Sequence, residues 1–147
     1  MMSIKVIGAF LAIFSFAIIL EIPKKYLSYA GLVGAIGWFS YLISIEGGAN
    51  DILATFLSAV SIAFVSHIFA RVFKTPVTIF LIPGIIPLVP GTGMYQIAFA
   101  IVKNEYYKVE TYFLNTLQLA GMIALGIIIV DAVFQLGIPK GKKEVQK

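Results

Sequence analysis

Long apolar stretches separated by short polar turns fill almost all of the chain. Four stretches have the length and apolar character of a spanning helix, which needs about 20 residues: they cover residues 4–20, 27–45, 52–70 and 117–136. A fifth stretch, residues 77–102, is apolar but interrupted by prolines and glycines. The pattern predicts an all-α integral membrane protein with about five transmembrane helices, the fourth discontinuous, in a single transmembrane domain over residues 1–147.

Polar residues and turn formers mark the connections between these stretches. Residues 46–51 predict a tight turn in which Asn50 or Asp51 caps the helix that follows. Residues 103–110 are expected to form the only long polar connection, and residues 140–147 a basic cytoplasmic tail.

The composition agrees with a membrane protein and argues against an enzyme. Of the 147 residues, 60% are hydrophobic and 12% are charged, and the mean hydropathy is +0.98, which lies outside the range of soluble domains. The sequence has no cysteine and one histidine, so disulfides and thiolate metal sites are excluded and His67 cannot build a metal site alone. No nucleophile and base, metal or nucleotide motif is recognisable, so neither catalysis nor a cofactor is expected.

The basic residues predict the orientation of the spans. Lysines and arginines near short connections stay on the cytoplasmic side of a membrane. If all five segments span, eight of the eleven basic residues lie on one side, whereas a fourth segment that enters and returns divides them five against six. The eight are Lys24, Lys25, Arg71, Lys74, Lys140, Lys142, Lys143 and Lys147. The asymmetry favours five spans in the cytoplasmic membrane, with the N-terminus outside and the C-terminus inside. The net charge of +4 therefore indicates topology and not nucleic-acid binding.

The most informative motif lies within the interrupted segment. Three prolines and three glycines fall within the eleven residues 83–93: Pro83, Pro87 and Pro90, with Gly84, Gly91 and Gly93. Each proline removes a backbone donor and clashes with the preceding helical turn, so the helix should open here. Because an unsatisfied backbone group costs several kcal/mol in hydrocarbon, this segment is expected to face the interior of an assembly.

A second half-helix starting after the break would allow the motif to bind a ligand. The free amides of Gly91, Thr92, Gly93 and Met94 would point into a cavity from the positive end of the helix dipole, which suits a carboxylate. Tyr95 and Gln96 would add side-chain hydrogen bonds. The alternative is a proline-kinked helix that only packs.

Charged and small residues in the other segments allow two interpretations each. Asp131 lies within the last helix, on the face of Ala120 and Ala124, which is expected to meet protein. It is interpreted as a proton-coupling acid or as the structural partner of His67 or Arg71. Ser58 and Ser61 form, with Thr55, a polar stripe that would line a pathway or bond to a neighbouring helix.

At residues 83–91 the sequence PGIIPLVPG, with Tyr95 four residues later, resembles the signature of the threonine/serine exporter family, specifically its small membrane subunit. The general layout of the chain is similar over nearly its whole length. The resemblance implies export of threonine, serine or related small carboxylates, including dicarboxylates such as succinate. It also implies a larger membrane subunit as partner, and a higher oligomer is possible. The presence of one discontinuous helix agrees, because secondary transporters often pair two repeats that each contribute one.

These observations favour the small subunit of a two-component secondary transporter that exports small carboxylate-bearing solutes. A channel subunit, in which unwound carbonyls select ions without alternating access, is the alternative from a second class. A membrane assembly protein without transport activity is the third.

Overall fold

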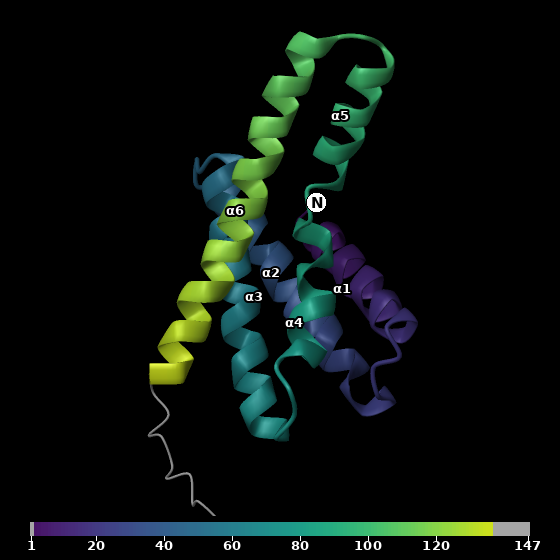
Figure 1. Ribbon diagram of the computed structural model, residues 1–147. Coiled ribbons are helices and arrows are strands. Elements are labelled where there is room, and N and C mark those ends of the chain that lie inside the picture. The colour runs from purple at the N-terminus through teal and green to yellow at the C-terminus, as the bar shows by residue number, and fades with distance from the viewer. Residues whose placement is uncertain (1, 137–147) are drawn as a thin grey trace, which may run out of the picture.

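The structure, a computed structural model, describes residues 2–136, and the regular structure of that range is helical throughout (Figure 1). The elements are α1 (Met2–Ile19), a 3-10 turn η1 (Lys24–Tyr26), α2 (Leu27–Glu46), α3 (Asp51–Phe73), α4 (Thr78–Ile85), a second 3-10 turn η2 (Ile86–Leu88), α5 (Gly91–Val102) and α6 (Tyr106–Leu136). The predicted all-α class is confirmed. The predicted basic tail, residues 140–147, lies outside the described residues.

Four helical segments have the length and apolar character needed to cross a membrane: Met2–Ile19, Lys24–Glu46, Asp51–Phe73 and Tyr106–Leu136. The segments Thr78–Leu88 and Gly91–Val102 meet the same criterion only as a pair, and they are bent by 47° where they join. The protein is therefore a multi-pass membrane protein with four spans, or five if the bent pair is one span.

The packing of α6 on α3 shows that the bent pair runs through the molecule in one direction. Gly126 approaches Ala59, and further along both helices Asp131 contacts His67. Since the residue numbers increase together, α3 and α6 are parallel. α4 rises from the end of α3, α5 continues the rise beyond the start of α3, and α6 descends beside α5 and then α3 (Figure 1). This path is that of one bent span and not of a segment that returns to its own side.

Close helix contacts hold the core together. A Cβ placed on Gly34 would overlap Ile13 of α1, and one placed on Gly37 would overlap Ile62 of α3. Small residues on α2 therefore let both neighbouring helices approach, as expected for helices in membranes. Just before the start of α2, Tyr26 packs edge-on against Phe80 of α4 with ring centroids 5.6 Å apart.

Two expectations about α6 are wrong. Ala120 and Ala124 are exposed, and the helix instead packs through the buried residues Thr116, Ile123, Gly126 and Val130. The long polar connection over residues 103–110 does not exist either, because α5 ends at Val102 and α6 begins at Tyr106.

The short connection into α6 is a compact polar turn. Asn104 adopts a left-handed conformation with φ 59°, and the Lys108 ammonium lies 2.8 Å from the Glu105 carboxylate. This hydrogen bond lowers the pKa of Glu105. The first turns of α6 contain polar residues, like the connection before them. Apolar runs alone therefore could not show where α6 begins.

Candidate functional site

The helix opens at the second and third prolines of the motif and not at the first. Pro83 is inside α4, which continues to Ile85 before tightening into the 3-10 turn of residues 86–88. At Pro90 the backbone has φ −76° and ψ 57°, the geometry of an inverse γ-turn, and the Gly91 amide donates to the Val89 carbonyl at 2.7 Å. The expected break is therefore present, centred on residues 87–90.

The start of α5 offers fewer free donors than expected. Gly91 is bonded within the γ-turn, and the Met94 amide donates to the Pro90 carbonyl at 3.2 Å, so the prediction that these two amides are free is wrong. Among hydrogen bonds between described residues, the amides of Thr92 and Gly93 have no acceptor. The first turn of α5 thus presents two donors at the positive end of its dipole.

A cavity of about 210 Å³ lies against this break. Four helices and the unwound segment form its walls. Its lining residues are Trp38 and Tyr41 of α2, Asp51 and Thr55 of α3, Pro87, Leu88, Val89 and Pro90 of the break, Thr92 of α5 and Leu119 of α6. Three of the predicted site residues, Pro87, Pro90 and Thr92, are therefore brought together on its wall.

The polar side of the cavity comes from helices that the motif did not implicate. The Tyr41 hydroxyl donates to Asp51 Oδ1 at 3.2 Å, joining the end of α2 to the start of α3. Trp38 stacks on Tyr41 with ring centroids 5.3 Å apart. Of these residues the sequence suggested a place along a pathway only for Thr55, as part of the polar stripe on its helix, and it suggested Asp51 only as a helix cap.

Other predicted site residues lie elsewhere. Pro83 and Gly84 are buried in the helix packing, where a Cβ on Gly84 would lie 2.9 Å from Val33 Cγ1. Gly91 has nothing within 4 Å of its Cβ position, whereas a Cβ on Gly93 would overlap the Thr116 hydroxyl.

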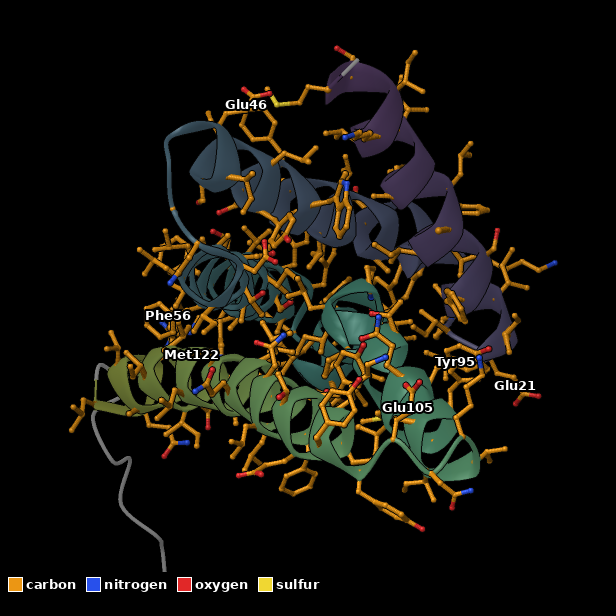
Figure 2. The ribbon with its side chains drawn as sticks, turned by 90° about the horizontal axis from the view of Figure 1, so that it is seen from above. Glu21, Glu46, Phe56, Tyr95, Glu105 and Met122 are labelled. Carbon is orange, nitrogen blue, oxygen red and sulfur yellow. The ribbon has the colours of Figure 1, made fainter. Side chains whose placement is uncertain are left out.

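Tyr95 and Gln96 do not line the cavity at the break. Tyr95 is 67% exposed, and Figure 2 shows it on the opposite side of the bundle from Phe56 of α3. Gln96 lines a separate groove of about 430 Å³ with Asn115, Gln118 and other residues of α6. Their roles as site residues stay predictions.

The comparison with known protein families decides the class of protein. A family model described as "Threonine/Serine exporter, ThrE" matches residues 5–133. The chain belongs to the threonine/serine exporter family. The match includes the break and every helix that lines the cavity, and it assigns this exporter-family chain to the membrane transporters and not to an enzyme family. No solved structure matches the chain.

A second polar cluster of this exporter-family chain lies near the far end of α3. His67 Nε2 is 3.0 Å from Asp131 Oδ1, and Gln135 Nε2 donates to Asp131 Oδ2 at 2.8 Å. Arg71 does not contact Asp131 here, because its guanidinium donates to the Phe134 carbonyl at 2.9 Å. The structure thus pairs Asp131 with His67, one of its two expected partners, and a coupling role for this pair stays a prediction.

The polar stripe on α3 bonds mainly to α2. The Ser58 hydroxyl donates to the Gly37 carbonyl at 2.6 Å, and the Ser61 hydroxyl lies 3.0 Å from that of Ser40. These two serines are helix-to-helix contacts, one of the two expected interpretations. Thr55 alone of the stripe lines the cavity.

Proposed function

We propose that this chain is the small subunit of a two-component secondary transporter that exports small carboxylate-bearing solutes across the cytoplasmic membrane. The candidate solutes are threonine, serine and dicarboxylates such as succinate. Membership of the exporter family supports transport, and the description of the matching family model supports threonine and serine.

The break between α4 and α5 is the observation that carries the proposal. A bend of 47° joins the two half-helices, and a cavity of about 210 Å³ lies against it. Thr92 lines this cavity, and the free amides of Thr92 and Gly93 at the end of a helix dipole support the binding of a carboxylate there. Discontinuous helices with such ends are a recurrent way for transporters to bind small charged solutes.

The larger subunit enters the proposal because α5 is poorly covered. Its exposed side chains include Met94, Tyr95, Phe99, Ile101 and Val102, which are 46–80% accessible. The described residues also hold a single broken span, whereas sites of this kind commonly combine two. We propose that a second membrane chain with its own broken helix packs on α5 and completes the pathway.

The experiment that tests this proposal is counterflow in proteoliposomes. Vesicles containing this chain, its candidate partner, or both are loaded with unlabelled threonine, serine or succinate, and uptake of the labelled solute is followed. We expect transient accumulation only when both chains are present. Uptake without counterflow would favour the channel subunit, and no exchange by an intact complex would overturn the proposed solutes.

A further inference from the structure

The cavity at the break carries a negative charge and no compensating basic side chain. Asp51 is its only carboxylate, and among the described residues that line it there is no lysine, arginine or histidine. Asp51 is exposed, so water weakens its repulsion of an anion, but a site that receives only a carboxylate would still be expected to carry the opposite charge.

Asp51 lies in the first turn of α3, where its negative charge stabilises the helix dipole, but it is not the N-cap of that helix. The N-cap of that helix is Asn50, whose side chain accepts from the Leu53 amide at 2.9 Å. The carboxylate of Asp51 is instead held by the Tyr41 hydroxyl through Oδ1. No hydrogen bond between described residues engages Oδ2, which leaves one oxygen available to a ligand in the cavity.

The neighbours of Asp51 suit a positively charged group. Trp38 lines the same cavity, and the face of an indole ring attracts cations. The hydroxyls of Tyr41 and Thr55 supply further acceptors. Thr92 lines the same cavity and lies in the first turn of α5, whose free amides suit an anion.

We infer that Asp51 binds the ammonium group of a zwitterionic amino acid and so selects amino acids over dicarboxylates. This inference rests on the proposed transport function and names the residue that sets its substrate class. The carboxylate of the solute would meet the Thr92 and Gly93 amides, and its ammonium group would meet Asp51 Oδ2 beside Trp38. A dicarboxylate would place its second negative charge against Asp51.

Space and the surrounding charges agree with a small amino acid. The cavity, at about 210 Å³, is large enough for several water molecules or a small solute. Lys5 lines a different cavity of about 320 Å³, which shares Trp38 and Pro87 as walls. Among the described residues, Lys5 and Asp51 do not form an ion pair.

The test compares two carboxyl variants in the complete two-chain complex. Counterflow of labelled threonine is measured for the wild type, Asp51→Asn and Glu46→Gln. Glu46→Gln removes an acidic charge from the same turn, but Glu46 is exposed at the edge of the bundle and does not line the cavity (Figure 2). Unlabelled serine, succinate and 3-hydroxybutyrate, which has no ammonium group, serve as competitors.

We expect Asp51→Asn to raise the half-saturating threonine concentration about 10- to 100-fold, the range for loss of a charge-assisted hydrogen bond. Glu46→Gln should match the wild type. In the wild type, serine should compete strongly while succinate and 3-hydroxybutyrate should compete weakly. In Asp51→Asn the preference for serine over 3-hydroxybutyrate should shrink, which a general loss of structure would not produce. Unchanged threonine affinity in Asp51→Asn, or equal competition by succinate in the wild type, would overturn the inference.

Trp38 gives a second measurement that does not require transport. It is the only tryptophan in the sequence, so its fluorescence reports on the cavity in the full-length chain. Threonine should change this fluorescence in the wild type and in Glu46→Gln but not in Asp51→Asn. If the two-chain complex exchanges no solute, the proposed function fails and this titration decides on binding: no response to millimolar threonine overturns the inference, and a response that depends on Asp51 supports it.

Discussion

Gly91 and Gly93 lie two residues apart but have different surroundings. The Cβ position of Gly91 is open, whereas that of Gly93 is occupied by the Thr116 hydroxyl, which itself donates to the Tyr112 carbonyl at 2.7 Å. Gly93 is thus a point of close approach between α5 and α6. A side chain at Gly93 would disturb the packing of α5 on α6, whereas a side chain at Gly91 would only fill open space.

We expect Gly93→Ala to lower the free energy of unfolding by about 1–3 kcal/mol, the usual cost of overpacking. Gly91→Ala should leave the melting temperature unchanged, because nothing lies within 4 Å of the added methyl group. Thermal unfolding in detergent measures both effects. Combining Gly93→Ala with Thr116→Ala should restore part of the loss, and an unaltered melting temperature for Gly93→Ala alone would contradict the assigned contact.

The pair formed by His67 and Asp131 can be tested by its two possible roles. Asp131→Ala removes the contacts to His67 and Gln135, and we expect a loss of about 1 kcal/mol because the Asp131 side chain is 43% exposed. Asp131→Asn keeps an acceptor for His67 and should cost less. If the pair is structural, counterflow and net export by Asp131→Asn stay near wild type. Normal counterflow with abolished pH-driven export would instead assign proton coupling to Asp131.

At the scale of the helix, the prolines that open the chain are Pro87 and Pro90. Proline in a helix interior costs about 3 kcal/mol, and alanine carries no such penalty. In the double variant Pro87→Ala/Pro90→Ala we therefore expect α4 and α5 to straighten into a more continuous helix. Spin labels on Thr78→Cys and Lys103→Cys, in a chain without native cysteine, should move further apart, and solute exchange should fall.

Pro76→Ala is the matched control, since Pro76 precedes α4 and lies outside the bent pair. It should leave the distance between the labels unchanged. An unchanged distance in the double variant as well would mean that the bend is imposed by packing and not by the prolines.

The sequence predicted the break and a cavity at it, but not the wall that α2 and α3 contribute, for a physical reason. Loss of backbone donors at Pro87 and Pro90 is a local effect that any one segment reveals. The wall formed by Tyr41 and Asp51 depends on how α2 and α3 are rotated and on where their shared turn meets the break. Helices that are apolar on all sides give little periodicity, so their rotation is not encoded in the pattern.

The same limit explains the error on α6. Small residues occur on several faces of that helix, and the one that meets α3 is Gly126, which lies 3.0 Å from Ala59 Cβ by its Cβ position. The face of Ala120 and Ala124 looks equally suitable in the sequence. Only the tertiary packing shows that α3 lies on the other face.

At the scale of the whole molecule, the parallel arrangement of α3 and α6 predicts that successive turns alternate between the two sides of the membrane. In intact cells, an impermeant maleimide should label Glu46→Cys and Asn104→Cys but not Thr75→Cys, which should react after permeabilisation. This result would place the N-terminus outside. Labelling of Thr75→Cys alone would reverse the orientation, and equal access of Thr75→Cys and Asn104→Cys would indicate a returning segment between them.

Because α6 is longer than a bilayer is thick, the thickness of the lipid bilayer also affects the stability of this helix arrangement. Its 31 residues span about 46 Å, whereas the hydrocarbon core of a bilayer is about 30 Å thick. If residues 117–136 fill the hydrocarbon, the first third of α6 extends beyond it, and α5, which packs beside that third, is covered by lipid only in part. Lipids with longer acyl chains would reduce this hydrophobic mismatch by covering more of α5. Acyl-chain length would then act on α5, and through it on the bend that joins α5 to α4.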